Sequence, residues 1–482
     1  MTGLAGILLA LGLLIFLAYR GVSVLLLAPL MAMLAAAFAS APLLGLYTQV
    51  FMNSAGGFVI SFFPLFLLGA IFGRLMDDSG AAKAIAQGLV ARLGGGQAIL
   101  AVVLACAILT YGGVSLFVVA FAIYPIAANL FREADIPKRL IPATIALGAF
   151  TFTMTALPGT PAIQNAIPMP FFGTTPFAAP GLGILAALVM FGAGQWWLMR
   201  RAATARAAGE GYGQHDDTPA KPDKEMRERA AGEGYDVVEI EGEKQLRRLP
   251  PFALAVLPVV VVILANLVFS TFVIPAWDTS FLAEPGFGAT GLQSVLGVWS
   301  IILALSLAIL VLVATNWTRL PKLRRSLDDG ANASVLPIFN TASLVGFGAV
   351  IAALPAFDMV REGVLGLGGD NPLISLAVAV NVLAGITGSA SGGMSIALST
   401  LGETYMEMGA AAGIAPEALH RITAIATGGL DALPHNGAVV TLLAICGLTH
   451  RQSYGDLAMV AVVFPLGSLV VAIAAASLFG AF

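Results

Sequence analysis

The chain has 482 residues, of which 58% are hydrophobic and only 11% are charged, and its mean hydropathy is +0.91. Soluble proteins are about 25% charged, so this composition excludes a soluble fold and indicates a polytopic membrane protein. The formal charge of −3 gives no support to nucleic-acid binding. The two cysteines, Cys106 and Cys446, lie in apolar runs and suggest neither a disulfide framework nor a metal site.

The first half of the chain, residues 1–199, is a series of apolar runs, each near the length of about 20 residues that crosses a membrane. No positively charged region precedes the first run, so we expect no separate cleavable signal peptide. The runs are Leu4–Tyr19, Val22–Leu43, Phe58–Met76, Gln97–Phe131, Leu140–Pro170 and Phe177–Met199.

A polar segment, residues 200–249, follows the first half. Between Arg200 and Arg248 it carries 21 of the 51 charged residues of the chain, and it contains the heptapeptide Arg-Ala-Ala-Gly-Glu-Gly-Tyr twice, at 206–212 and 229–235. This composition predicts a flexible linker with a local duplication. A regulatory site is the alternative.

The second half, residues 250–482, is again a series of apolar runs: Phe252–Ile274, Leu292–Asn316, Val335–Pro355, Leu373–Leu401, His420–Gly447 and Leu457–Phe482. A cytoplasmic linker places 22 of the 24 Lys and Arg in the cytoplasm, with Arg361 and Arg421 as exceptions, if 97–131 and 372–402 each enter and leave on one side. The halves are then inverted and both termini are periplasmic. Tight pairs of fully spanning helices give the same sidedness.

Two short motifs recur in both halves, in the same order and at similar spacing. Tyr111–Leu116 resembles Ser391–Ile396, and Ala156–Ile163 resembles Ala432–Val439. We therefore predict an all-α polytopic membrane protein with two inverted-topology repeats. Each repeat would contain a re-entrant helical hairpin (97–131 and 372–402) and a broken transmembrane helix (140–170 and 418–447).

The repeated motifs are rich in glycine and proline, which interrupt helices at membrane depth only where protein or a cavity satisfies the freed backbone groups. The pairs Gly112-Gly113 and Gly392-Gly393 suit hairpin tips, and the sequences after Pro158 and Pro434 suit unwound points. Half-helix N-termini that converge there would favour an anion such as a carboxylate. The alternative is that these residues only kink and pack helices.

Asp431 and His435 lie well inside an apolar run, where ionisable residues are costly and usually functional. They share one helix face if the helix continues to Pro434. We expect Asp431 first, or His435, to carry a coupling proton. The alternative is a structural role, in which Asp431 caps a broken helix or bonds His435. We expect His420 at the membrane interface. We interpret Asn340 and Asn381 as buried residues that pack or that satisfy backbone groups, although a substrate contact is possible.

Motifs of enzymes and ATP-driven pumps do not appear: no Gly-Lys-Ser/Thr phosphate loop, no metal-site spacing and no nucleophile elbow. We expect no enzymatic activity and no cofactor beyond a coupling ion, H⁺ or Na⁺. A channel is the other mechanistic class, because broken helices do not exclude one.

Three stretches, Thr110–Phe117, Ala156–Pro161 with Gln164-Asn165, and Gly428–Gly437, resemble the gluconate permease family, nearest its members for 3-hydroxybutyrate and related short hydroxy acids. The resemblance covers both hydrophobic halves and leaves the linker unmatched. It implies proton symport of a small organic monocarboxylate across the bacterial inner membrane, and membership of the wider ion transporter superfamily. It also implies a scaffold domain, a moving transport domain that carries the hairpins, and a homodimer.

The site residues carried over from the resemblance are Gly112, Gly113, Ser115, Thr160, Asn165, Gly392, Gly393, Ser395, Asp431, His435 and Asn436, and Ser391 joins them from its place in the second motif. We expect no arginine or lysine at membrane depth in this site, so helix N-termini and hydroxyls would hold the carboxylate. The expected mechanism is elevator-type alternating access with proton symport. Sodium-coupled symport and an anion channel are the alternatives.

Overall fold

The computed structural model describes residues 2–20, 22–215, 217, 249–369 and 371–482, and the elements in this part of the chain are helices. The second copy of the heptapeptide, at 229–235, lies outside the described residues. Seven helices of the described part are long and apolar enough to cross a membrane, namely Leu43–Asp78, Leu116–Glu133, Pro180–Ala207, Phe252–Ala276, Leu292–Arg319, Leu323–Ala352 and His450–Phe479. The prediction of a polytopic helical membrane protein is confirmed.

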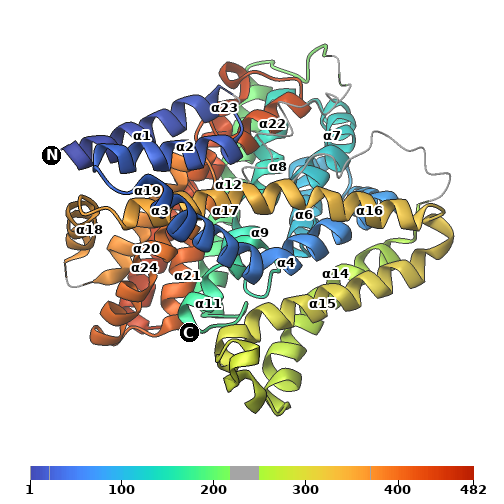
Figure 1. Ribbon diagram of the computed structural model, residues 1–482. Helices are drawn as coiled ribbons and strands as arrows, with labels where there is room; N and C mark the ends of the chain where they lie inside the picture. The colour runs from blue at the N-terminus through green and yellow to red at the C-terminus, as the bar shows by residue number, and fades with distance from the viewer. Residues whose placement is uncertain (1, 21, 216, 218–248, 370) are drawn as a thin grey trace.

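The first half folds into a long series of helices (Figure 1). In chain order they are α1 (Thr2–Tyr19), α2 (Val24–Phe38), α3 (Leu43–Gly45), η1 (Leu46–Phe51), α4 (Met52–Asp78), α5 (Ala81–Leu93), α6 (Ala98–Tyr111), α7 (Leu116–Glu133), η3 (Lys138–Leu140), α8 (Ile141–Ala149), α9 (Phe152–Thr155), α10 (Ile163–Ala166), α11 (Pro168–Phe172) and α12 (Pro180–Ala207). Because arginine and alanine favour helix, α12 continues into the segment that the sequence predicts as linker.

The second half contains α14 (Phe252–Val268), η5 (Phe269–Val273), α15 (Leu292–Asn316), α16 (Leu323–Ala333), α17 (Val335–Ala352), α18 (Phe357–Leu365), α19 (Pro372–Thr387), α20 (Ala390–Ala411), α21 (Pro416–Ala426), η11 (Leu430–Ala432), α22 (Gly437–Ile445), α23 (His450–Ala458), η12 (Met459–Val463) and α24 (Phe464–Phe479). The α14–α15 pair projects from the body of the molecule in Figure 1.

Two helix pairs, α6–α7 and α19–α20, occupy the positions of the predicted hairpins, and the helices of each pair pack against each other. At a rise of 1.5 Å per residue, the 14-residue α6 is only about 21 Å long, which is short of the roughly 30 Å hydrocarbon core. The 16-residue α19 is about 24 Å long on the same basis. The partner helices α7 and α20 have 18 and 22 residues, and re-entry, the sidedness and the inverted relation of the halves stay predictions.

The tip of the first pair lies where the sequence predicts it. The helix α6 ends at Tyr111, Gly113 has a φ of +91° that disfavours side chains, and Ser115 caps the N-terminus of α7. The tip of the second pair lies earlier than expected. Gly388, at φ +63°, ends α19 and Ser389 caps α20, so Gly392 and Gly393 lie in the first turn of a helix.

Gly393 allows close helix packing rather than forming a tip. A Cβ at this position would lie 2.2 Å from the backbone nitrogen of Ala384 in the preceding helix. This close approach supports, at Gly393, the alternative interpretation that these glycines pack helices.

Both predicted broken helices are interrupted. The first consists of α8 and α9, then an unwound segment at 156–162, then α10 and α11. The second consists of α21, a segment at 427–436 that contains only the short turn η11, and α22. Gly159 and Gly429, with φ of +82° and +113°, lie in these segments and release the chain from helical geometry.

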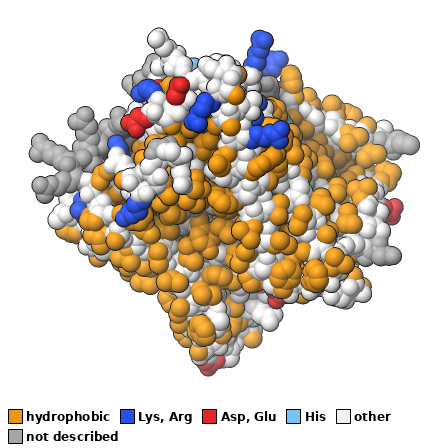
Figure 2. Space-filling model, turned by 180° about the vertical axis from the view of Figure 1, so that it is seen from behind, with side chains coloured by type: hydrophobic (Ala, Val, Ile, Leu, Met, Phe, Trp, Pro, Cys, Tyr) orange, Lys and Arg blue, Asp and Glu red, His pale blue; other side chains and the backbone are white. Residues whose placement is uncertain are grey.

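The helix pairs and broken helices bury their side chains in one large apolar core with α5, α12, α23 and α24. A second apolar cluster lies under α1, α2 and α17. One face of the molecule is broadly apolar, with Lys and Arg side chains gathered toward one end (Figure 2). This distribution suits a protein surrounded by lipid with a basic end in water.

Candidate functional site

The tip of the first helix pair, from Tyr111 to Ser115, is called tip 1 below. It is bonded to the first unwound segment. The Tyr111 hydroxyl donates to the carbonyl of Pro158 at 2.7 Å. A Cβ on Gly113 would lie 2.7 Å from Cγ of Pro161, so a larger residue would push these segments apart. The Ser115 hydroxyl accepts from the backbone N–H of Phe117 at 3.3 Å and satisfies one free donor of α7. Gly112 ends α6 nearby.

The tip of the second helix pair, at Gly388 and Ser389, is called tip 2 below. It is bonded to the second unwound segment in the same manner. The Asn436 amide donates to the carbonyl of Gly388 at 2.8 Å, and its oxygen accepts from the N–H of Ala438 at 2.7 Å, capping α22. His435 donates through Nε2 to the carbonyl of Gly385 at 3.1 Å. Tip 2 is therefore fixed by side chains of the unwound segment.

Asn381 strengthens this contact from α19. Its amide donates to the carbonyl of Gly428 and accepts from the N–H of Leu430, both at 3.3 Å. The prediction that this residue satisfies backbone groups is confirmed.

Residues from the two halves meet in one small cavity, which we call the Asp431 cavity. Its wall contains Leu116 from the N-terminus of α7, Gln164, Asp431, and Asn436 with Ala438 from the N-terminus of α22. Its volume is about 10 Å³, the size of a single water. The side-chain oxygen of Gln164, a residue only 1% exposed, has no hydrogen-bond partner.

A second cavity, the Gly113 cavity, lies on the other side of tip 1. Gly113, Ser115 and Pro161 form one wall, and residues of α4 and the start of α17, including Ala70 and Pro337, form the other. Its volume is about 30 Å³. Neither cavity has room for more than about one or two waters.

Not every predicted site residue reaches a cavity wall. Ser391, Gly392, Gly393 and Ser395 are buried in α20, and the hydroxyl of Ser395 has no partner. Thr160 is fully buried and accepts from the N–H of Ala162 at 3.3 Å. Asp431 and His435 are not on one helix face, because α21 ends at Ala426.

Three threonines near the first break bond their own helix backbone, as the sequence predicts for part of the hydroxyl set. Thr151, Thr153 and Thr155 donate to the carbonyls of Leu147, Gly148 and Thr151 respectively. These hydroxyls are therefore already engaged in holding the broken helix together.

The largest difference from the sequence analysis is Arg421, which is fully buried. The expectation that the site contains no arginine or lysine in its interior is wrong. The guanidinium donates to the carbonyls of Ala156, Pro176 and Ala178, at 2.8 to 3.2 Å, and to the side-chain oxygen of Asn165 at 3.0 Å. These bonds use each of its five N–H donors.

His420, expected at the interface, is also fully buried. Its Nε2 donates to the side-chain oxygen of Asn165 at 3.2 Å, and its Nδ1 accepts from the hydroxyl of Thr174 at 2.6 Å. The Asn165 amide itself donates to the carbonyls of Thr160 and Pro176 at 2.9 and 3.0 Å. The amide of Asn165 is thus fully engaged within the protein and leaves no group free for a substrate.

A signal for this cluster exists in the sequence, because His420 and Arg421 are adjacent polar residues at the start of an apolar run. Counting charges by loop position assigns Arg421 to an outer segment, whereas the structure shows that α21 turns it inward against the first broken helix. The cluster joins the two halves of the chain at the first unwound segment.

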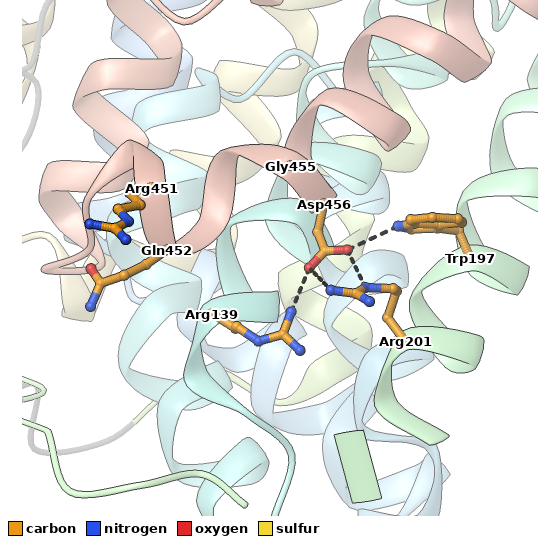
Figure 3. Close-up of a pocket in the computed structure, with 7 residues that line it drawn as sticks. All are labelled: Arg139, Trp197, Arg201, Arg451, Gln452, Gly455 and Asp456. Atoms are coloured by element: carbon orange, nitrogen blue, oxygen red, sulfur yellow. Dashed lines mark hydrogen bonds and ion pairs between the residues drawn. The ribbon is translucent and has the colours of Figure 1, made fainter. Parts of the chain in front are cut away.

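A larger cavity, of about 480 Å³, lies elsewhere and is lined by none of the predicted site residues. Arg139, Trp197, Arg201 and Asp456 meet there, with Arg451 and Gln452 further along its wall (Figure 3). The Asp456 carboxylate accepts from Arg139 and Arg201, each at 2.7 Å, and from the Trp197 ring nitrogen at 3.1 Å. It ties α23 to α12 and η3.

The start of the linker is docked beside this cavity, and we call residues 206–215 and 217 the strap. Arg139 donates to Glu210 at 2.7 Å, and the Tyr212 N–H donates to Asp135 at 2.9 Å. Asp217 pairs with Arg132 and Lys138. The hydrogen bonds from the Arg139 guanidinium hold the pKa of Glu210 below its ordinary value.

Comparison with known proteins places the chain among transporters. Residues 2–195 match the GntP family of permeases. The transporter YxjC of Bacillus subtilis (strain 168), described as uncharacterized, is 47% identical over 458 residues, which cover 94% of each chain. The crystal structure of the YdaH transporter of Alcanivorax borkumensis has a similar fold, with a TM-score of 0.52 and 15% identity over 89% of this chain and 87% of that one. The resemblance to the gluconate permease family is thereby confirmed, and the chain belongs to the GntP family of permeases as a multi-pass membrane transporter.

Proposed function

We propose that the protein is a secondary active transporter that imports a small organic monocarboxylate, of the 3-hydroxybutyrate, lactate or gluconate kind, together with a proton. The observation that carries the proposal is the composition of the Asp431 cavity. One carboxyl side chain there shares a wall with the N-termini of two helices from different halves of the chain.

The helix N-termini supply the attraction for an anion. Leu116 begins the 18-residue α7, and Asn436 caps α22. Free N–H groups and the positive end of the helix dipole favour a carboxylate at such positions.

Asp431 supplies the coupling. An ionised Asp431 in the same small cavity would repel a carboxylate substrate strongly, because two like charges at close range in a protein interior cost several kcal/mol. A proton on Asp431 removes this repulsion, so substrate and proton bind together more readily than either does alone. Na⁺ beside the carboxylate would act in the same way and is the second candidate for the coupling ion.

The small size of both cavities supports alternating access by a moving unit. The Gly113 cavity separates tip 1 from α4 and α17, which makes this contact a natural sliding surface. We propose that the helix pairs and broken helices move as the transport domain, and that the remaining helices form the scaffold of an elevator-type cycle in a homodimer.

The test is uptake of radiolabelled 3-hydroxybutyrate, lactate and gluconate into proteoliposomes. We expect at least one of them to accumulate when the outside is made acidic, with no requirement for sodium. Accumulation driven only by a sodium gradient would replace the proton by Na⁺. Uptake indifferent to both gradients would reject symport, and single-channel conductance in planar bilayers would reject a carrier.

A further inference from the structure

Asn340 on α17 is buried, and the polar atoms of its side chain are left without hydrogen bonds. Only 1% of the residue is exposed, and neither the amide nitrogen nor the amide oxygen of its side chain has a hydrogen-bond partner. Among the residues that the structure describes, no other side chain has two polar atoms in this condition. A buried amide without hydrogen bonds lowers the stability of the fold, so its presence in a packed helix points to a ligand that pairs with it.

The position of Asn340 follows from its neighbours on α17. Pro337, one turn earlier, lines the Gly113 cavity beside tip 1. Leu344, one turn later, packs against the start of α20 beside tip 2, because a Cβ at Gly392 would lie 2.4 Å from its Cδ1. Residues three and four apart share one helix face. Asn340 therefore lies on the face of α17 that runs from one tip to the other.

A second contact fixes the level of Asn340 relative to tip 2. A Cβ at Gly348 would lie 2.8 Å from Cγ2 of Ile396. From the Leu344–Gly392 contact to the Gly348–Ile396 contact, both helices advance by one turn, so α17 and α20 run parallel. One turn before Leu344, Asn340 then lies toward the N-terminal end of α20, which is the end where tip 2 lies.

We propose that Asn340 is a substrate-binding residue that recognises the hydroxyl group of a hydroxy acid, and this inference rests on the proposed function. The amide oxygen accepts from the hydroxyl while the amide nitrogen donates to the carboxylate. A simple carboxylate can satisfy only one of the two buried groups. A site built to bond a hydroxyl discriminates against the analogue that lacks it, because the site is left with an unpaired polar group. Asn340 thus makes hydroxy acids the preferred substrate class.

The experiment compares the wild type with Asn340→Leu, which keeps the side-chain volume and removes both polar groups. The paired substrates are 3-hydroxybutyrate and butyrate, which differ only in the hydroxyl group. For the wild type we expect a KM at least about tenfold lower for the hydroxy acid, the value of one hydrogen bond. For Asn340→Leu we expect this preference to disappear, through a higher KM for 3-hydroxybutyrate and little change for butyrate.

Thermal stability without substrate is the second readout. Asn340→Leu should melt at the same or a higher temperature than the wild type, because it removes an unsatisfied group from the interior. The matched control is Asn381→Leu, which leaves the carbonyl of Gly428 and the N–H of Leu430 unpaired and should melt lower.

Three outcomes overturn the inference. A lower melting temperature for Asn340→Leu would show that the amide holds the fold. Retention of the wild-type preference by Asn340→Leu would show that the amide does not read the hydroxyl. A wild type that takes up both substrates equally would also reject the inference while leaving carboxylate transport intact. If the wild type takes up neither these substrates nor lactate or gluconate, the proposed function itself fails, and the role of Asn340 fails with it.

Discussion

In the proposed function, the charge of Asp431 sets whether the Asp431 cavity accepts an anion. The residue lies in the short turn η11, outside any long helix, and its carboxyl faces the N–H groups of its own turn.

The substitution Asp431→Asn keeps the shape of this side chain and removes its charge change. We expect gradient-driven accumulation of the substrate to be lost while exchange of substrate across the membrane is retained, because a neutral amide permits anion binding and carries no proton. Counterflow and acid-driven uptake in the same proteoliposomes separate the two activities. Unimpaired accumulation by Asp431→Asn would remove the residue from the coupling role.

The sequence identified Asp431 for a physical reason that holds in any membrane protein, since a carboxyl within an apolar run is expensive and therefore conspicuous. The same reasoning did not reach Arg421 and Asn340. Arg421 lies near the start of its run, where a positive charge usually faces water. Asn340 is an uncharged residue whose missing partners become visible only when its surroundings are known.

At the scale of elements, the helix α21 acts through the Arg421 guanidinium as a clamp on the first broken helix. The guanidinium bonds carbonyl groups at the start of the unwound segment, at Ala156, and in the loop between α11 and α12, at Pro176 and Ala178. Freed carbonyls in an interior must be paired, and a buried arginine can pair several at once.

Arg421→Met should therefore destabilise the protein severely, by about 1–3 kcal/mol for each buried acceptor that loses its donor. Arg421→Lys should lie between the wild type and Arg421→Met, because an ammonium keeps the charge but not the planar fork. Melting temperature in detergent measures both. The control is Arg451→Met, which removes an exposed arginine and should change stability by less than about 0.5 kcal/mol. Equal melting temperatures for Arg421→Met and Arg451→Met would contradict the clamp.

The interruptions in the helices could be predicted from glycine and proline, and Gly113, Gly159 and Gly429 have the positive φ that explains them. The end of α19 could not, because Gly388 and Gly392 are both plausible ends in the sequence. What distinguishes them is tertiary: Asn436 bonds the carbonyl of Gly388, whereas Gly392 packs against Leu344. Helix boundaries at such sites depend on contacts that the local sequence does not contain.

At the scale of the whole molecule, polar contacts form between the two halves of the chain as well as within each half. Arg421 and His420 of the second half hold Asn165 of the first. Asp456 of the second half holds Arg139 of the first half and Arg201 at the start of the predicted linker. Pairings across such sequence separations follow from the fold and cannot be read from either half alone. The repeated motifs predict only that corresponding segments exist in both halves.

The strap joins the start of the linker to the first half of the chain. It docks onto the end of α7 and onto η3, next to the first helix pair. Its ion pair between Glu210 and Arg139 should make docking depend on pH. The pKa of Glu210 is lowered in the folded state, so the pair contributes fully above the ordinary glutamate value of about 4.3. The contribution is lost as the pH falls from there through the lowered pKa of the folded state.

Hydrogen–deuterium exchange of residues 206–215, corrected for intrinsic rates, should show constant protection from pH 7 to about pH 5 and a loss of protection below about pH 4. Glu210→Gln should reduce protection at neutral pH and flatten this dependence, because the amide cannot form the ion pair. High salt should weaken docking in the wild type, since the Glu210 side chain is 42% exposed and the pair is open to screening. The control is Glu133→Gln, which removes a neighbouring exposed carboxylate outside this pair and should leave the profile unchanged. If Glu210→Gln and Glu133→Gln gave the same profile as the wild type, Arg139 and Glu210 would not be what holds the strap against the first helix pair.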